Sequence, residues 1–297
     1  FRLYTKPITA IAKKYNIEIH LYADDTQLYV PFDPRNSKEA MERLEACIDE
    51  IRKWMSQNFL KLNDSKTEKN LDLITEWTLS IGDTEILPSS IVRNIGAMFD
   101  STFSMRAHIS RTIRSCYYQL RSLAKIRKYL STEAAKSLTH ALVTSRLDNM
   151  NSLLYNIPDD LLKKLQLVQN CAARLVMQVK KSHHITPVLK QLHWLPVKFR
   201  IEYKILLLVY KCLNGKGPIY LSSLLEQYHP PRALRSAAQH LLREVRVHQR
   251  YGERAFSVAG PKLWNRLPLD IKNCGSVNSF KKSLKTHLFK CAFNSNT

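Results

Sequence analysis

Glycine and clustered cysteine are scarce in this 297-residue sequence, which holds seven glycines and six scattered cysteines. The patterns of glycine-rich phosphate loops do not occur in it. The cysteines form no C-x-x-C pair, which argues against a zinc site of that type and against a disulfide framework, and favours a reducing compartment. The longest apolar run, "ILLLVY", is too short to cross a bilayer. Because no signal peptide is recognisable either, we expect an intracellular protein, nuclear or cytoplasmic, without a transmembrane segment.

Acidic side chains are scarce after residue 100. The first 100 residues hold 13 basic and 16 acidic side chains, so the remaining 197 residues hold 33 of the 46 basic and 9 of the 25 acidic ones. Such a basic segment favours a polyanionic partner. Nucleic acid is the first candidate, because each neutralised phosphate releases counterions. An anionic membrane surface and a merely solvated basic surface remain the alternatives.

A tight hairpin is predicted close to the start of the chain. Residues 17–22 (IEIHLY) alternate apolar and polar side chains, which is the pattern of a half-buried strand. Residues 26–30 (TQLYV) are rich in strand-forming types. Asp24 and Asp25 lie between these two segments, so we expect both aspartates at the tip of the hairpin.

The rest of the first hundred residues mixes helix and strand. Residues 37–59 carry one apolar stripe at helical spacing, formed by Met41, Leu44, Ile48, Ile51 and Met55. Short strands are expected around Gly82 and Gly96. We therefore predict one mixed segment over residues 1–104.

A helical pattern begins at about residue 105. The first helix has an apolar stripe made of Ile109, Ile113, Tyr117, Leu120 and Ala124. At about 100° per residue, five basic side chains fall within an arc of roughly 100° beside this stripe, namely Arg111, Arg114, Arg121, Lys125 and Lys128. No acidic residue interrupts them. Both a phosphate-binding face and an ordinary solvated face fit this basic stripe.

Further helices are expected to the end of the chain. One spans about residues 132–146, with Ser131 as its N-cap, and the next opens at Pro158. The segment FRIEYKILLLVYKCLNGKGP, which begins at residue 199, predicts one more helix; it is apolar on nearly all sides over residues 205–210 and is therefore expected to be buried. A basic amphipathic helix ends the sequence, with Phe280, Leu284 and Leu288 on its apolar face. A polar stretch at residues 179–188 suggests a boundary, so we predict a helical segment over 105–178 and a basic, mainly helical one over 179–297.

Adjacent aspartates at a hairpin tip have a specific chemical use. Two-metal nucleotidyl transfer needs carboxylates that bind Mg²⁺ ions roughly 4 Å apart, and Mg²⁺ prefers oxygen ligands. A solvated Asp-Asp turn is common, however, because Asp favours turns. The two residues alone leave both interpretations open.

The wider context resembles one family. Y-A-D-D between two strand-forming runs resembles the C motif of reverse transcriptases. "HLYADDTQLY", "NFLKLNDSKTE" and "VRNIGAMFDSTFSMRAHI" resemble palm segments of LINE-type enzymes, from non-LTR retrotransposons of the Jockey-like group. "LVTSRLDNMNSLLYNIP", "HHITPVLKQLHWLPVKFRIEYKILLLVYKCLNGKGPIYL" and "RAFSVAGPKLWNRLP" resemble the thumb and C-terminal region of the same reading frames. The resemblance covers nearly the whole sequence.

This resemblance implies a role for individual residues. Asp24 and Asp25 would be the catalytic Mg²⁺ ligands, with Tyr22 and Ala23 beside the primer end. Lys66 resembles the lysine that approaches the nucleotide triphosphate, although a surface lysine is an equal alternative. Residues 94–100 resemble the hairpin that holds the primer strand, and this segment contains Asn94 and Gly96. The helices after residue 105 would form a thumb whose basic stripe contacts the nucleic-acid backbone.

The implied fold class is α+β, a partial palm followed by a mainly helical thumb and C-terminal region. In the family, a further Asp and a Q-G-S-type loop precede the C motif, and this sequence, whose first residue is Phe, begins after their position. We therefore expect a fragment of an RNA-directed DNA polymerase that is inactive alone, with RNA template, DNA primer and hybrid duplex as partners. The alternative is a non-catalytic nucleic-acid-binding protein derived from the same element.

Overall fold

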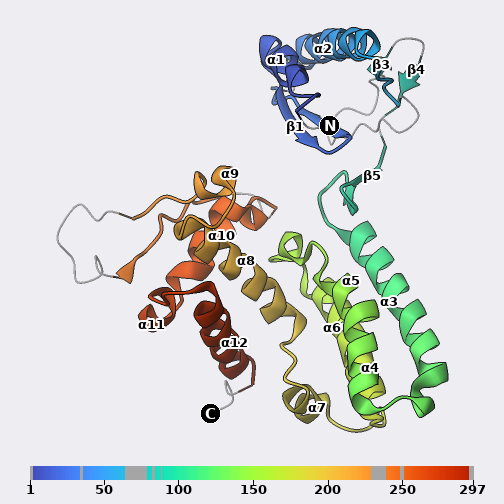
Figure 1. Cartoon of the computed structure of the whole chain (residues 1–297), viewed down its shortest axis with the longest axis vertical. Coiled ribbons are helices and arrows are strands. Elements are labelled where there is room, and N and C mark those ends of the chain that lie inside the picture. The colour runs from blue at the N-terminus through green and yellow to red at the C-terminus, as the bar shows by residue number, and fades with distance from the viewer. Residues whose placement is uncertain are drawn as a thin grey trace. The chain divides into compact units, whose positions relative to one another are not determined.

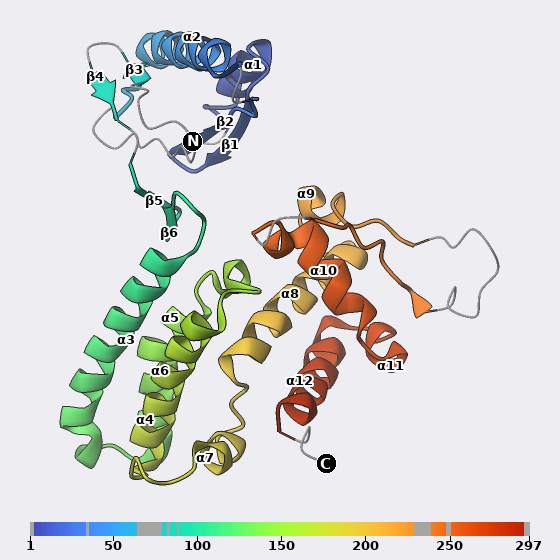
Figure 2. The same cartoon turned by 180° about the vertical axis from the view of Figure 1, so that it is seen from behind.

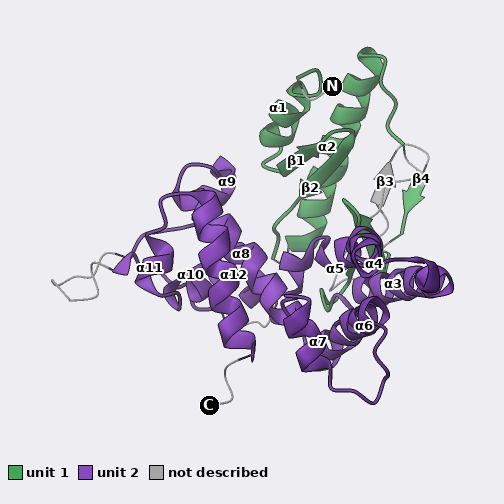
Figure 3. Ribbon diagram, turned by 60° about the horizontal axis from the view of Figure 1, so that its bottom comes forward, with its two compact units in different colours: residues 1–104 green, residues 105–297 purple. Residues whose placement is uncertain are grey.

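The computed structural model describes residues 3–33, 36–63, 79–81, 84–87, 89–228, 239–247 and 251–293. The described chain is mixed α and β and mostly helical, with short antiparallel hairpins. It divides into two compact units (Figure 3), unit 1 over residues 1–104 and unit 2 over residues 105–297. Unit 2 contains both segments predicted from the sequence, residues 105–178 and 179–297. The predicted boundary between them at residue 178 stays a prediction.

Unit 1 combines helices with two-stranded antiparallel hairpins (Figure 1). Its described elements are α1 (Pro7–Lys14), β1 (Glu18–Tyr22), β2 (Asp25–Tyr29), α2 (Ser37–Gln57), β3 (Leu79–Ile81), β4 (Thr84–Ile86), β5 (Ile91–Asn94) and β6 (Ala97–Asp100). Strands pair only within the hairpins β1–β2, β3–β4 and β5–β6 among the described residues. Short strands therefore lie on both sides of Gly82 and of Gly96, as the sequence predicts.

The core of unit 1 lies between α1, α2 and the first hairpin. Cys47 and Ile51 of α2 are buried in one cluster with Ile8, Ala12 and Ile17. Ile48, on the neighbouring side of α2, is buried against Ile86 of β4. The apolar stripe predicted for this helix is confirmed, and its burial supplies the main free-energy gain that offsets the entropy of ordering the unit.

Unit 2 is mainly helical in its described residues (Figures 1 and 2), with one isolated antiparallel bridge between Gln227 and Leu242. The long helices are α3 (Arg106–Ile126), α6 (Asp159–Met177), α8 (Val197–Leu213), α10 (Phe256–Asn265) and α12 (Val277–Phe293). Shorter ones are η3 (Arg127–Tyr129), α4 (Thr132–Thr139), η4 (His140–Thr144), α5 (Ser145–Asp148), η5 (Asn151–Leu154), α7 (Ile185–Gln191), α9 (Ile219–Ser222), η7 (Gly252–Arg254) and α11 (Leu269–Lys272). None of the helices in the described ranges is both long and apolar enough to span a membrane.

Helix α8 lies at the centre of the C-terminal half of unit 2, where it contacts α6, α10 and α12. Its run at residues 205–210 contributes four buried side chains, Ile205, Leu206, Val209 and Tyr210. The ring of Tyr210 stacks on Phe280 of α12, with centroids 4.1 Å apart. Phe280, Leu284 and Leu288 are all buried, so the predicted apolar face of the last helix is confirmed.

The helix after residue 131 also follows the prediction at its start. The hydroxyl of Ser131 accepts a hydrogen bond from the backbone N–H of Ala134, at 3.2 Å, which is the N-cap interaction expected from the sequence. The helix then continues from α4 through η4 into α5. The middle part, η4, is a turn of π-helix that begins at His140. Such turns are rare and occur frequently at functional sites.

Candidate functional site

The tip of the β1–β2 hairpin is a two-residue turn. Tyr22 pairs with Asp25 across the strands, so Ala23 and Asp24 form the turn and Asp25 is the first residue of β2. Of the two predicted tip residues, only Asp24 therefore lies in the turn itself. All four side chains from Tyr22 to Asp25 are exposed. Because both carboxylates stay hydrated, the hairpin avoids the desolvation cost that burying the pair would bring.

Ala23 has a φ of 53°, in the left-handed region that an L-residue with a Cβ avoids. Replacing Ala23 by Gly should relieve this strain and raise the free energy of unfolding of unit 1 by roughly 0.5–1 kcal/mol, net of the extra entropy of the unfolded chain. Hydrogen exchange of the β1–β2 amides in denaturant measures the change. The control is Ala10→Gly at an exposed position of α1, which should lower stability by roughly the same amount. An equal loss in both variants would contradict the strain.

The first and third hairpins are joined through their polar side chains. In the β1–β2 register, Tyr22 and Asp25 lie on the same face as His20 and Gln27. The side-chain amide of Gln27 donates to the side-chain oxygen of Asn94 at the end of β5. The Tyr29 hydroxyl donates in turn to Gln27. The hairpin that resembles the catalytic motif thus shares its polar face with the one that resembles the primer-holding segment.

Gly96 serves the turn of this third hairpin. Asn94 pairs with Ala97 across β5 and β6, so Ile95 and Gly96 form a two-residue turn. Their φ values are 45° and 88°. Positive φ at both central positions is the pattern of a type I′ turn, in which Gly meets the need for a left-handed backbone without strain. Asn94 accepts the hydrogen bond from Gln27 and Gly96 permits the turn, so these structural roles are sufficient to explain both residues.

The carboxylates of Asp24 and Asp25 match Mg²⁺ in ligand type but not in number. Both offer oxygen atoms on an exposed turn, which suits a hard cation that keeps several waters. A two-metal centre of the resembled kind needs a third carboxylate, yet no cluster of three acidic, histidine or cysteine side chains suited to a metal occurs within the described residues. Lys66, the predicted contact of the nucleotide triphosphate, lies outside the described residues.

The basic stripe predicted on the first helix after residue 105 lies on α3, with its last member in η3. All five side chains are exposed, namely Arg111, Arg114, Arg121, Lys125 and Lys128. The buried face of α3 includes Ile109, Cys116, Leu120 and Leu123. At about 100° per residue, the two faces are centred roughly 160° apart or more. The basic stripe therefore points away from the core of unit 2.

The predicted apolar stripe of this helix needs a correction. Ala124 was expected in the core but is exposed, whereas Cys116 and Leu123 are buried and were not predicted. The reason is that α3 contacts both α6 and the α4–η4–α5 segment, which shifts its buried face around the helix. As a result, the basic stripe lies opposite the buried face and not beside it.

Two exposed tyrosines near the basic stripe were not singled out from the sequence. Tyr118 falls inside the same arc of α3 at helical spacing, and 62% of its surface is exposed. Tyr129 is 76% exposed, and the ammonium of Lys128 lies 4.8 Å from the centre of its ring. Exposed aromatic rings among basic side chains are typical of surfaces that bind single-stranded nucleic acid. Both tyrosines fall within the arc of the basic stripe at about 100° per residue, so helical spacing alone could have identified them from the sequence.

Comparison with known proteins gives no match. No protein-family model, no curated protein and no solved structure shows significant similarity to this chain.

Proposed function

We propose that this chain is part of an RNA-directed DNA polymerase of the LINE type. Unit 1 supplies the hairpin with Asp24 and Asp25, and unit 2 contacts the nucleic-acid backbone through its basic stripe. The observation that carries the proposal is the hydrogen bond from Gln27 to Asn94. The two residues are 67 positions apart in the sequence, and they belong to hairpins that the resemblance assigns to catalysis and to primer binding.

The two aspartates contribute only part of the metal site in this proposal. Mg²⁺ bound there would neutralise charge on the phosphates during nucleotidyl transfer. A further carboxylate has to complete the set, because the described residues hold no group of three metal ligands. In this proposal, the β1–β2 hairpin presents two hydrated carboxylates, and Gln27 on the same hairpin contacts Asn94 of the third hairpin.

Iron-mediated cleavage tests the metal site directly. Fe²⁺ takes the same oxygen ligands as Mg²⁺, and with ascorbate and peroxide it cuts the backbone beside its site. We expect cleavage within residues 20–30, suppressed by excess Mg²⁺ and lost in the Asp24→Asn/Asp25→Asn double variant. The matched control is Asp159→Asn/Asp160→Asn, the other adjacent pair, which is also exposed and opens α6. Cleavage that survives the first double variant, or that follows the second, would refute the assignment.

A non-catalytic nucleic-acid-binding protein is the second candidate function. One observation favours it, the presence of five exposed basic side chains on the side of α3 opposite its buried face. Unit 2 has its own core around α8, so this surface does not depend on the carboxylates of unit 1. The two candidates differ in a simple way, because only the first requires metal binding at Asp24 and Asp25.

A further inference from the structure

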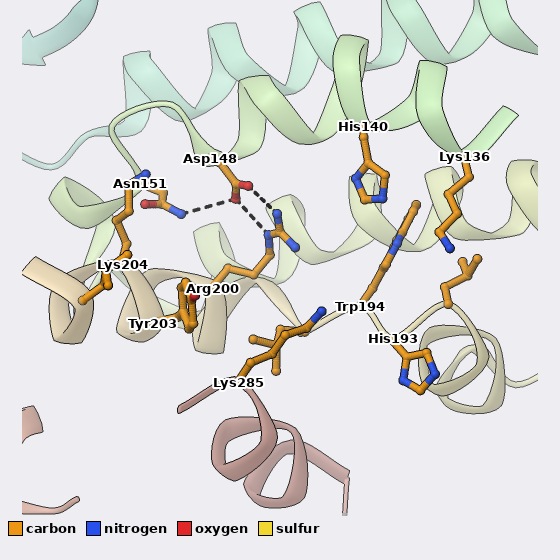
Figure 4. Close-up of a pocket in the computed structure, with 13 residues that line it drawn as sticks. Lys136, His140, Asp148, Asn151, His193, Trp194, Arg200, Tyr203, Lys204 and Lys285 are labelled. Carbon is orange, nitrogen blue, oxygen red and sulfur yellow. Dashed lines mark hydrogen bonds and ion pairs between the residues drawn. The ribbon is translucent and has the colours of Figure 1, made fainter. Parts of the chain in front are cut away.

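A cavity of about 470 Å³ lies within unit 2 (Figure 4), and no residue of the basic stripe lines it. Its walls come from α4 and α5, the loop at residues 192–195, α8 and α12. Its lining includes the side chains of Lys136, His140, Trp194, Arg200, Lys204 and Lys285. A volume in this range is typical of sites for small organic ligands.

The lining of this cavity is strongly basic. Asp148 is its one acidic residue, and it is already paired with Arg200, whose Nε lies 2.8 Å from Asp148 Oδ1 and whose Nη2 contacts the other carboxylate oxygen. The remaining charged groups are cationic, namely Lys136, Lys204 and Lys285. In the described part of the chain, no carboxylate forms an ion pair with any of these three lysines.

Two polar atoms in the wall lack a hydrogen-bond partner among the described residues, the indole N–H of Trp194 and the side-chain oxygen of Asn151. Trp194 is 4% exposed, and its indole N–H has no hydrogen-bond acceptor among the described residues. A buried donor without an acceptor is costly, so an oxygen atom supplied by a ligand would be stabilised there. The Trp194 ring lies 5.1 Å from the ring of His140, where the π-helical turn begins. In Figure 4 the indole stands beside His140 and Lys136, with Lys285 reaching towards the same space from α12.

The wall that carries Trp194 is held firmly in place. The side chain of Gln169 in α6 is buried and donates to the carbonyl oxygen of Leu195 at 2.9 Å. Gln166 accepts from the backbone N–H of Val197, also at 2.9 Å. Burial, followed by the charges of Arg200 and Lys136, lowers the pKa of His140. The cavity is therefore a prearranged site with an excess of positive charge, where an anion would find compensation for its lost hydration.

We propose that this cavity binds the phosphate group of a nucleotide, either free or at the end of a strand. Ammonium groups that approach from separate elements suit a tetrahedral dianion, which presents oxygen atoms in several directions, better than a planar carboxylate with two. The volume exceeds the need of the phosphate alone, and the rings of His140, Trp194 and Tyr203 offer surfaces for the attached nucleoside. The residues of this site are different from Asp24, Asp25 and those of the basic stripe.

Titration calorimetry on the whole chain tests this site with inorganic phosphate and with a nucleoside monophosphate. We expect both to bind, the nucleotide more tightly. Lys136→Met/Lys285→Met should weaken binding by roughly 100-fold, because each charged hydrogen bond is worth about a factor of ten or more. Trp194→Phe keeps the ring but removes the N–H, and should weaken binding roughly fivefold. A melting scan without ligand establishes that each variant is folded.

The matched control is Lys281→Met/Lys282→Met, which removes the same charge from exposed positions of α12 outside the cavity. An equal effect of both double variants would show diffuse attraction and overturn the proposal, as would the absence of phosphate binding at millimolar concentration. A dinucleotide with a 5′-phosphate is then compared with its 5′-hydroxyl form. Preference for the phosphorylated form identifies a strand end as ligand, and exclusion of both identifies a free nucleotide. Neither result depends on metal binding at the hairpin.

Discussion

Replacement of all five residues of the basic stripe by Gln is expected to weaken binding to duplex or RNA–DNA hybrid by roughly 10³- to 10⁴-fold at about 0.1 M salt. Each residue that contacts a phosphate contributes about −0.9 to the slope of log affinity against log salt on B-form duplex. The slope should therefore become shallower by about 4 units, and affinity should depend little on base sequence because phosphates carry no sequence information. Fluorescence anisotropy over a salt series measures both quantities.

The control for this experiment removes five positive charges elsewhere in unit 2. Suitable exposed positions outside the basic stripe and the phosphate cavity are Lys180, Lys181, Lys216, Lys281 and Lys282. Their replacement by Gln should change the slope by much less. Equal effects would mean that binding is diffuse electrostatic attraction and that α3 has no special part in it. Failure of the unaltered protein to bind at about 50 mM salt would remove both candidate functions for unit 2.

Replacement of Arg127 by Leu is expected to lower the free energy of unfolding of unit 2 by about 3 kcal/mol. Arg127 is buried in η3, and its guanidinium donates to the carbonyl oxygens of Leu175 and Val176 at 3.0 and 2.6 Å. A third bond, of 2.7 Å, goes to the carbonyl oxygen of Leu130. The first two acceptors lie at the end of α6, where carbonyls lack partners within the helix and a positive charge is favoured. Leu would leave all three acceptors unsatisfied.

The neighbouring Lys128 provides the matched control. Its side chain is exposed, and replacement by Leu should change stability by less than about 0.5 kcal/mol. Chemical denaturation measures the free energy of unfolding of both variants, which should fall mainly in Arg127→Leu. The salt dependence of nucleic-acid binding, measured as the slope of log affinity against log salt, should instead change mainly in Lys128→Leu. Lys128→Leu should lower that slope by about one unit, whereas Arg127→Leu should leave it unchanged under conditions where the protein is folded. Similar stability losses at both positions would contradict the capping role of Arg127.

Much of the local structure of this chain could be predicted from its sequence. The apolar stripe of α2, the buried run of α8, the face of α12 and the N-cap at Ser131 all follow from spacing within a few residues, where the helix itself determines which side chains are neighbours. The same holds for the β1–β2 hairpin, because alternation of apolar and polar side chains defines two strands, and the segment between them has to turn. The position of Asp24 and Asp25 close to the tip was therefore predictable.

Arg127 and Lys128 show where this reasoning ends. The two residues are adjacent and both basic. Helical spacing places Lys128 in the basic stripe and Arg127 on the apolar side of the helix, but it does not reveal which groups Arg127 contacts. Arg127 is buried because the end of α6 lies against η3 and offers the carbonyl oxygens of Leu175 and Val176. The burial of Cys116 and Leu123 in place of Ala124 has the same origin, since it depends on which helices cover α3. Such differences are decided by partners that are distant in the sequence.

The candidate sites divide in the same way. The sequence by itself determined the presence of a carboxylate pair close to the tip of a hairpin and of a basic stripe on one helix, because both features are local. Tertiary structure alone decided that Gln27 meets Asn94, and that Lys136, Trp194, Arg200 and Lys285 line one cavity. Contacts of this kind arise when separate elements bury their apolar faces together, and the side chains that meet are then set by the packing of the whole unit.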